Sequence, residues 1–258
     1  MSKIVTISNQ KGGVGKTTTA INLAAYVAEK GHRVLIVDID PQGNATTGLG
    51  IAKNQLRGSM YDVMLCQIPA EEVILHTQVD NLDILPCTNE LVGAEINLIN
   101  VNRREFVLQD SLTPLRDIYD FIFIDCPPSL GLLTLNALTA SDRVIIPVQS
   151  EFFALEGLSQ LVNTIKIVKE RTNPSLEVDG VVLTMYDSRS IMSRQVTEEI
   201  QRFFGEKVYK YPVPRNIKVT EAPGFGIPIS IHAPKSSGGA AYQKLAEEFI
   251  NREEKKIK

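Results

Sequence analysis

The stretch that determines the fold lies near the amino terminus and reads Asn9-Gln10-Lys11-Gly12-Gly13-Val14-Gly15-Lys16-Thr17-Thr18. An apolar run, Lys3–Ser8, precedes it. A helical pattern follows over Thr17–Lys30, where apolar side chains recur every three or four residues. Glycines let the backbone turn with its N–H groups pointing inward, so a strand, a glycine-rich turn and a helix N-terminus together form a nest for an anion. The sequence therefore predicts a phosphate-binding loop.

Two side chains of this loop have expected roles in nucleotide binding. Lys16 is expected to reach the β- and γ-phosphates, and the Thr17 hydroxyl to ligate Mg²⁺. The strict pattern G-x-x-x-x-G-K-[ST] is not met, because Gln10 stands where its first glycine belongs. The strand–loop–helix context that the pattern requires is present, so a glycine-rich turn that binds nothing is the weaker alternative. The residues predicted to bind the nucleotide here are Lys11, Gly12, Gly13, Val14, Gly15, Lys16, Thr17 and Thr18.

Outside the loop, apolar runs alternate with helical patterns along most of the chain. We expect a single α/β domain over residues 1–258, a P-loop NTPase with a mostly parallel twisted sheet, helices on both faces and no separate helix-turn-helix domain. Strands are predicted at Lys3–Ser8, Arg33–Asp38, Leu82–Leu85, Phe121–Asp125, Val144–Val148 and Val178–Thr184, with an edge strand at Lys207–Tyr211. Helices are predicted at Thr17–Lys30, Ser59–Cys66, Arg103–Leu115, Leu132–Ala140, Leu155–Arg171, Ser193–Phe204 and Gly239–Arg252. The span Ile51–Glu105 gives the weakest pattern.

Composition excludes several classes of protein. The 258 residues are 43% hydrophobic and 22% charged, which is typical of a globular chain and not of a disordered, collagenous or coiled-coil one. No run approaches the ~18 consecutive apolar residues of a membrane-spanning helix, and the first residues do not resemble a signal peptide. The three cysteines, far apart in the sequence and without a C-x-x-C pair, indicate a reducing cytosol.

The net charge of −3 argues against a nucleic-acid partner, but it averages two unequal parts. Residues 1–179 hold 14 Lys/Arg and 21 Asp/Glu, a net of −7. Residues 180–258 hold the remaining 13 of 27 and 9 of 30, a net of +4. The charge of the whole chain is therefore the wrong quantity for predicting a partner.

Three carboxylates follow predicted strands. Asp125 ends the strand Phe121–Asp125, and Asp38 and Asp40 stand at the end of the second predicted strand, Arg33–Asp38. An Asp at the carboxyl end of an apolar strand beside a phosphate loop is where a Walker-B group holds the hydration shell of Mg²⁺. One such Asp alone is equally consistent with a turn or a helix cap. Three beside one phosphate loop favour a functional site, and Asn44 and Glu151 are further candidates at its edge.

The segment KGGVGKTT, with its extra Lys11, resembles the deviant Walker-A ATPases of the ParA/Soj and MinD superfamily. Other stretches resemble ParA/Soj signatures in family order: Val37–Ala45 (VDIDPQGNA), Ile122–Ser129 (IFIDCPPS), Leu183–Asp187 (LTMYD), Val213–Ala222 (VPRNIKVTEA) and Gly238–Tyr242 (GGAAY). The resemblance covers essentially the whole chain and favours the partitioning ParA proteins over their relatives. The short amino terminus resembles the Soj-like subgroup.

This resemblance implies an ATP hydrolase that uses Mg²⁺ and forms a sandwich homodimer when ATP is bound. The catalytic residues would be Lys11, Lys16 and Asp40. Lys11 would reach across the dimer to the phosphates of the partner's ATP, and Asp40 would orient or activate the attacking water. The metal site would consist of Thr17, Asp38 and Asp125, and Pro214 and Asn216 would contact the adenine.

The resemblance further implies nonspecific binding of double-stranded DNA by the ATP-bound dimer. A ParB-type centromere-binding partner would shorten the life of that dimer, and the protein would be cytoplasmic and nucleoid-associated. The segment Tyr186–Lys218 holds seven basic residues and four acids, and Arg189, Arg215 and Lys218 are the candidate DNA contacts. For any single one of them, a solvated surface charge is the more common outcome.

Three other functions remain as alternatives. A MinD-like membrane-cycling ATPase needs a C-terminal amphipathic helix with bulky apolar residues. The end of this chain, Phe249–Lys258, has mixed charge and few such residues, so membrane binding is disfavoured. A nitrogenase-iron-protein-like reductase needs two cysteines per subunit for a shared cluster, and Cys126 fits a buried strand end better. A bacterial tyrosine kinase would need a tyrosine-rich tail, whereas the seven tyrosines here are scattered.

Overall fold

A seven-stranded sheet runs through the centre of the molecule, in the order β3-β4-β2-β5-β1-β6-β7. The computed structural model describes residues 2–151 and 154–257. All neighbouring strands are parallel except β3 and β4, which pair antiparallel. The strands are β1 (Lys3–Ile7), β2 (Val34–Asp38), β3 (Leu75–His76), β4 (Leu82–Leu85), β5 (Phe121–Asp125), β6 (Arg143–Gln149) and β7 (Glu177–Thr184).

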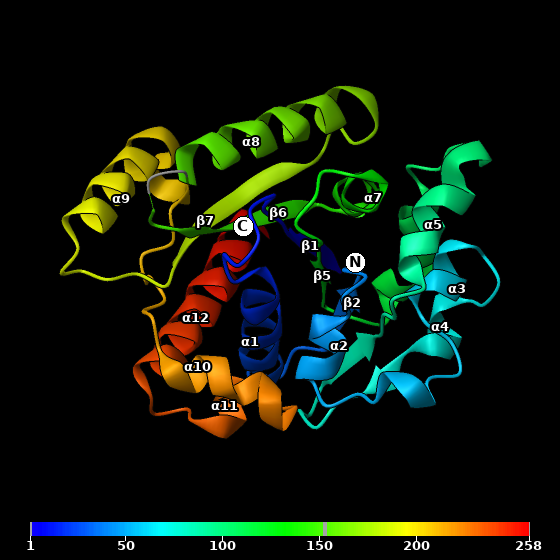
Figure 1. Cartoon of the computed structure of the whole chain (residues 1–258), viewed down its shortest axis with the longest axis horizontal. Helices are drawn as coiled ribbons and strands as arrows, with labels where there is room; N and C mark the ends of the chain where they lie inside the picture. The colour runs from blue at the N-terminus through cyan, green and yellow to red at the C-terminus, as the bar shows by residue number, and fades with distance from the viewer. Residues whose placement is uncertain (1, 152–153, 258) are drawn as a thin grey trace.

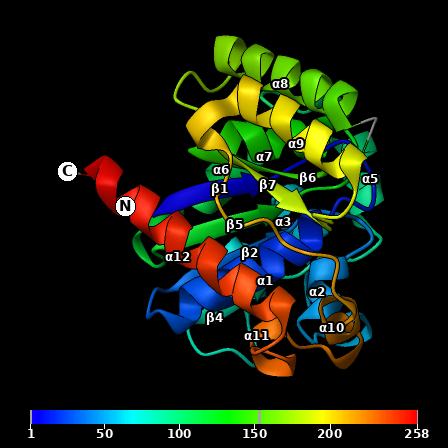
Figure 2. The ribbon, with the colours of Figure 1, turned by 90° about the vertical axis from the view of Figure 1, so that its left-hand side faces the viewer.

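Helices cover both faces of the sheet (Figures 1 and 2). One face carries α1 and α12, and the other carries α3 to α9. The helices are α1 (Lys16–Glu29), α2 (Asn44–Gly48), α3 (Met60–Met64), α4 (Ala70–Val73), α5 (Leu91–Asn97), α6 (Val107–Leu112), α7 (Leu132–Ala140), α8 (Ala154–Arg171), α9 (Ile191–Phe204), α10 (Ile217–Glu221), α11 (Ile229–His232) and α12 (Ser237–Ile257). The α/β fold class predicted from the sequence is thereby confirmed.

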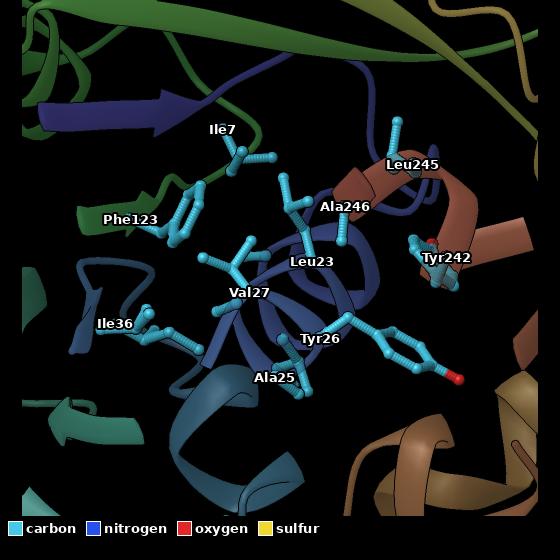
Figure 3. Packing of buried hydrophobic residues seen from close by; sticks show 14 of the residues in the cluster. Ile7, Leu23, Ala25, Tyr26, Val27, Ile36, Phe123, Tyr242, Leu245 and Ala246 are labelled. Carbon is cyan, nitrogen blue, oxygen red and sulfur yellow. The ribbon is translucent and has the colours of Figure 1, made fainter. Parts of the chain in front are cut away.

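Alternation along the strands sends side chains into two different cores. Ile7 of β1 packs with Phe123 of β5 and Leu23 of α1, whereas Ile4 packs into the core on the opposite face. Figure 3 shows α1 lying between the sheet and α12, with Ala246 of α12 beside Leu23 of α1. Because α1 is covered on both sides, its N-terminus and the loop before it are held on a rigid base.

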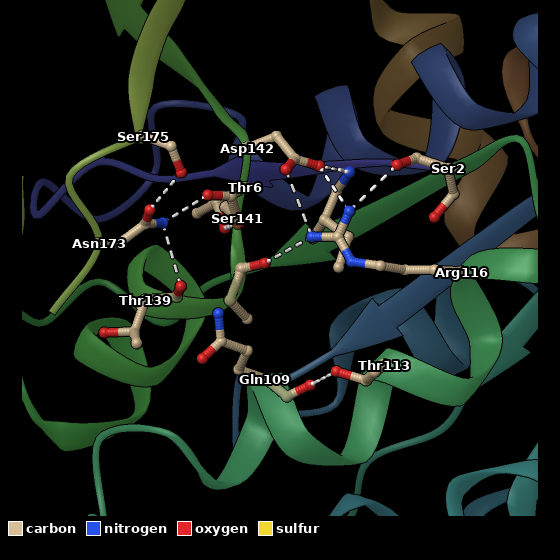
Figure 4. A network of polar contacts seen from close by, with 12 residues as sticks. Ser2, Thr6, Gln109, Thr113, Arg116, Thr139, Ser141, Asp142, Asn173 and Ser175 are labelled. Atoms are coloured by element: carbon tan, nitrogen blue, oxygen red, sulfur yellow. Dashed lines mark hydrogen bonds and ion pairs between the residues drawn. The ribbon is translucent and has the colours of Figure 1, made fainter.

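A polar network links the amino-terminal ends of several strands. Arg116 donates to the Asp142 carboxylate at 3.0 Å and to the Ser2 carbonyl at 3.1 Å (Figure 4). Asp142 immediately precedes β6, and Ser2 immediately precedes β1. The carboxyl ends of the strands lie at the opposite edge, which is where an open parallel sheet generally binds its ligand.

Two of the predicted elements differ from the structure. The predicted edge strand Lys207–Tyr211 is wrong, because Val208 makes only an isolated bridge to Val181. Proline at 212 and 214 offers no N–H, which prevents a continuous ladder beyond that bridge. The predicted helix Arg103–Leu115 is shorter and starts later: Arg103 takes a left-handed conformation with φ of 57°, and α6 begins only at Val107.

Candidate functional site

A cavity of about 490 Å³ opens at the carboxyl ends of the parallel strands. Its wall combines the phosphate loop, the turn after β2 and the segment that follows β7, which are far apart in the sequence. The lining residues are Gly12, Gly13, Gly15, Lys16, Thr17, Thr18, Asp40, Gln42, Asn44, Pro128, Thr184, Met185, Val213, Pro214, Arg215, Asn216, Val219, Thr220 and Tyr242. Most of the residues predicted for the nucleotide site therefore surround one space.

The phosphate loop adopts the backbone conformation that its glycines allow. Gly13 and Gly15 have φ of 74° and 85°, in the left-handed region that disfavours other residues. Gly15 caps the N-terminus of α1, and no side chain satisfies the N–H groups of that first turn. Free backbone N–H groups and the helix dipole make this a favourable place for a phosphate. Val14 differs from its neighbours because it is buried and does not line the cavity.

Lys16 lies at the floor of the loop with 6% of its surface exposed. Its ammonium donates a hydrogen bond to the Lys11 carbonyl at 3.1 Å. Burial lowers the pKa of Lys16, and the negative charges of Asp125 and Asp40 oppose that change. A nucleotide phosphate beside this ammonium would add a further negative charge, which would favour its protonated form.

Asp38 and Asp125 are neighbours across the pair β2 and β5 and are fully buried. One oxygen of Asp38 accepts hydrogen bonds from the Thr46 N–H at 2.8 Å and the Thr46 hydroxyl at 2.7 Å. The other accepts from the Asp40 N–H at 3.2 Å. Asp38 thus anchors the turn that carries Asp40, and it lies behind the cavity wall.

Asp125 has no such partners: neither oxygen accepts a hydrogen bond within the described residues. Burial, followed by the charge of Asp38, raises its pKa well above the usual range, and the nearby Thr17 hydroxyl and Lys16 offset part of this rise. A buried carboxylate without partners is costly for the folded protein. Its position beside Thr17 is suited to a hydrated cation held at the mouth of the loop.

Asp40 differs from the other two carboxylates because it lines the cavity itself. One of its oxygens accepts a hydrogen bond from the Gln42 N–H at 2.9 Å, which fixes the turn. Asn44, a further candidate from the sequence, begins α2 and lines the same wall. The structure therefore brings Lys16, Thr17 and Asp40 to one surface.

Pro214, Arg215 and Asn216 form another part of the cavity wall. The Asn216 amide is engaged within the protein: its oxygen accepts from the Lys218 N–H at 2.8 Å as the N-cap of α10, and its nitrogen donates to the Ser237 hydroxyl at 2.8 Å. This arrangement suits Asn216 to shaping the wall. The predicted contact with a base therefore falls more readily to Pro214.

Lys11 does not line the cavity that the loop's glycines line. Its ammonium pairs with the Glu151 carboxylate at 2.9 Å, and 32% of the lysine side chain is exposed. Glu151, the other candidate at the edge of the site, thus contacts the loop from the end of β6 without lining the cavity. The Lys11 side chain is directed outward, where a second molecule could meet it.

The predicted DNA contacts lie around the mouth of the cavity. Arg189 is 90% exposed and pairs with Asp187, whose pKa is lowered by Arg189 and also by the charge of Arg215. Lys218 is half exposed and pairs with Glu221 at 2.9 Å. These basic side chains are thus solvent-accessible, and each pairs with or lies near an acid of its own surface.

Several lining residues were not predicted from the sequence, among them Thr184, Met185, Pro128 and Tyr242. Thr184 ends β7, so the rule that strand ends face the ligand crevice was the signal for it. Met185 has φ of 48°, a left-handed conformation that is uncommon for such a residue. The Tyr242 hydroxyl lies 3.3 Å from that of Thr19, a contact between α12 and α1 that no local pattern predicts.

Comparison with known proteins assigns the chain to a family. A family model described as an AAA domain matches residues 2–178. The chain is 52% identical to the sporulation initiation inhibitor protein Soj of Bacillus subtilis, over 96% of this chain and 98% of Soj. It is 51% identical to the chromosome partitioning protein ParA of Myxococcus xanthus, over 98% of this chain and 89% of ParA.

Among solved structures, a cobyrinic acid a,c-diamide synthase of Mycobacterium smegmatis with bound ADP and magnesium is similar, with a TM-score of 0.87 and 37% identity over 98% of this chain and 96% of that one. That related protein carries a nucleotide and Mg²⁺ on the same fold. Within the described residues, no helix has the length and apolar character needed to cross a membrane. The full-length matches to Soj and ParA show that the chain belongs to the ParA/Soj family of partitioning ATPases.

Proposed function

We propose that this protein is a Mg²⁺-dependent ATPase of DNA partitioning. ATP drives formation of a sandwich homodimer that binds double-stranded DNA without sequence preference on the nucleoid. Hydrolysis, stimulated by a ParB-type partner, returns the protein to a form that releases DNA. The observation that carries this proposal is the single cavity whose wall joins the phosphate loop, Asp40 and the segment 213–216.

The dimensions and lining of the cavity support ATP as its ligand. At about 490 Å³ it is large enough for a nucleotide. The phosphates fit beside the glycine N–H groups and Lys16, and the base fits against Pro214 and Val219 at the other end of the cavity. The wall of one cavity thus offers a positive charge, hydrogen-bond donors and apolar side chains, which supports ATP as its ligand.

The residues near the loop also fit Mg²⁺. Thr17 would ligate the ion directly, and the buried Asp125, which accepts no hydrogen bond within the described residues, would hold its hydration shell with support from Asp38. Bound together with ATP, the ion neutralises charge on the β- and γ-phosphates. No cluster of three or more His, Cys, Asp or Glu side chains that could hold a metal occurs in the described part of the chain. This suits Mg²⁺, which is usually bound by one or two carboxylates together with substrate phosphates.

The outward direction of Lys11 supports a role between two molecules. An ammonium that leaves its own cavity can pair with the phosphates of a nucleotide in a second molecule, provided that it releases Glu151. An exposed ion pair of this kind contributes at most ~1 kcal/mol, so an ATP-bound partner can displace it. Dimerisation would then depend on the negative charge of the γ-phosphate.

We expect Lys11→Ala to bind ATP but to stay monomeric in its presence. The alanine removes the ammonium that would cross the interface, while the glycine N–H groups and Lys16 remain. Sedimentation velocity with Mg²⁺ and ATP measures the mass, and Glu151→Ala is the matched control because it removes only the partner of Lys11. The idea is refuted by a Lys11→Ala protein that dimerises with ATP as the wild type does.

The basic residues at the mouth of the cavity support DNA binding by the dimer. Phosphate contacts of this kind are strongly salt-dependent and carry no sequence information. The net charge of Tyr186–Lys218 is only +3, from seven basic and four acidic residues, so one copy offers a weak surface. Two copies double the contacted charge, which makes DNA binding conditional on dimerisation.

Arg189→Ala combined with Lys218→Ala should weaken DNA binding at low salt and leave ATP binding intact. Each lost phosphate contact should reduce the slope of log affinity against log salt by about 0.9. Retention on DNA is measured with ATP across a salt titration. The matched control, Lys166→Ala with Lys169→Ala, removes two exposed charges from α8 instead. Equal retention of the Arg189/Lys218 variant and the wild type would show that DNA binds elsewhere.

The contacts of α12 favour DNA, and not a membrane, as the surface to which the dimer binds. Phe249 and Leu245 of this helix are buried in the core. Near its end, Lys256 pairs with the buried Asp179 at 2.6 Å and Arg252 donates to the Val208 carbonyl at 3.1 Å. Over its described side chains, a helix held in this way packs its large apolar residues into the protein core, where they are not available to insert among lipids. Sedimentation with liposomes and ATP distinguishes the two surfaces.

A further inference from the structure

A buried hydroxyl connects the phosphate loop to the end of β7. Thr184, 3% exposed, donates a hydrogen bond from its hydroxyl to the Val14 carbonyl at 2.7 Å. The two residues are 170 positions apart in the sequence, and the contact joins a strand end to the middle of the loop. The neighbouring Gly15 is also close to Thr184, because a Cβ placed on it would lie 3.7 Å from the threonine methyl.

This hydrogen bond sets the orientation of one peptide plane. The Val14 carbonyl and the Gly15 N–H belong to the same planar trans unit and point in opposite directions. Gly15 and Thr184 both line the cavity, so holding the Val14 carbonyl on Thr184 also fixes the direction of the Gly15 N–H at the cavity wall. The loop's other end has a separate anchor, since the Asn9 amide donates to the Pro147 carbonyl at 2.7 Å and accepts from the Lys11 N–H at 3.0 Å.

The same plane would rotate easily without this hydrogen bond. Gly15 stands at φ of 85°, and glycine adopts positive and negative φ with nearly equal ease. A rotated plane would direct the Val14 carbonyl toward the phosphates and remove one N–H donor from them. Because Gly15 does not restrict this rotation, the orientation of the Val14–Gly15 peptide depends on a hydrogen bond from a residue outside the loop.

We propose that Thr184 is a positioning residue for ATP binding, which orients the Val14–Gly15 peptide so that its N–H faces the phosphates. The inference rests on the proposed function, because it concerns the same nucleotide site. The chain that follows Thr184 also connects the phosphate loop to the part of the cavity wall that contains Pro214. Two residues further on, the Tyr186 N–H donates to the Val213 carbonyl at 3.0 Å, and Tyr186 forms a bridge with Pro214.

The test compares Mg²⁺–ATP affinity by calorimetry in three variants and the wild type. Thr184→Val keeps the shape of the side chain but leaves a buried carbonyl without a donor, and it should weaken binding about ten-fold. Thr184→Ser restores the hydroxyl and should bind within two-fold of the wild type. The matched control is Thr6→Val. Thr6 also donates from a buried hydroxyl to a carbonyl, that of Ala137 at 3.2 Å. Figure 4 shows Thr6 beside Ser141, and neither residue lines the cavity.

Thr6→Val should lower the melting temperature and leave ATP affinity unchanged, whereas Thr184→Val should change affinity more than stability. Tripolyphosphate, which fills only the phosphate part of the site, should lose affinity by the same factor as ATP. If Thr184→Val does not fold, Thr184→Ala is titrated in its place. The inference is overturned if the variant lacking the hydroxyl binds ATP as the wild type does, or if serine fails to restore binding. A wild-type protein that does not bind ATP overturns the proposed function, and this inference with it.

Discussion

Asp40→Ala is expected to bind ATP with near wild-type affinity and to hydrolyse it about 100- to 10,000-fold more slowly, the usual contribution of a group that positions or activates a nucleophile. Asp40 is the one of the three carboxylates that lines the cavity, while Asp38 and Asp125 lie behind the wall. Its loss removes the group best placed beside the γ-phosphate and leaves Lys16 and the glycine N–H groups in place. The ATP-bound dimer should then persist, because the step that ends it has been slowed.

Phosphate release and nucleotide affinity are measured on the same preparation, so that a loss of hydrolysis is distinguished from a loss of ATP binding. Asp40→Asn is the matched control for structure, since an amide oxygen can still accept the hydrogen bond from the Gln42 N–H. It should fold as the wild type does and hydrolyse ATP as slowly as the alanine variant. Hydrolysis at the wild-type rate in either variant would remove Asp40 from the reaction.

Lys16→Ala is expected to weaken ATP binding roughly 100-fold, which corresponds to the loss of a charge-assisted hydrogen bond to phosphate in a site shielded from water. Lys16 is almost fully buried beside Asp125 and Asp40, and it is the cation that balances them at the floor of the loop. Without it, the phosphates would lose the ammonium that offsets the negative charges of Asp125 and Asp40 at the floor of the loop. The variant should therefore lose hydrolysis, dimerisation and DNA binding together.

Calorimetric titration with Mg²⁺–ATP checks this expectation. Lys30→Ala is the control, because Lys30 immediately follows α1 and pairs on the surface with Glu247 at 2.8 Å, far from the cavity. It should bind ATP as the wild type does. Arginine at position 16 should not restore binding, because its larger guanidinium does not fit the place of a compact ammonium. Near wild-type affinity in Lys16→Ala would show that the loop does not bind the phosphates as proposed.

The parts of the fold that follow local pattern were predicted well from the sequence. The strands Leu82–Leu85 and Phe121–Asp125 have the predicted bounds. The second of them is buried along its whole length, and an apolar run of that kind is a strong signal. The helix Leu132–Ala140 also matches. The phosphate loop and the carboxylates at the strand ends were predictable because topology alone brings the ends of parallel strands together.

The features that could not be predicted from the sequence depend on contacts between segments that are far apart in the chain. The span Ile51–Glu105 folds into helices of four to seven residues, too short to show a period, and an antiparallel pair β3–β4 of two residues in register. The outward direction of Lys11 follows from Glu151, 140 residues away. The hydrogen bond of Thr184 and the capping role of Asn216 are likewise tertiary features, and the sequence pattern alone pointed to neither.

The central claim is that ATP, and not ADP, pairs two copies of the chain. Light scattering during gel filtration of Asp40→Ala with Mg²⁺ and each nucleotide tests it most directly, because slow hydrolysis keeps ATP intact throughout the run. The account predicts twice the 28.5 kDa mass of the chain with ATP and the single mass with ADP. A protein that stays monomeric with ATP, or has the same mass with both nucleotides, would contradict it.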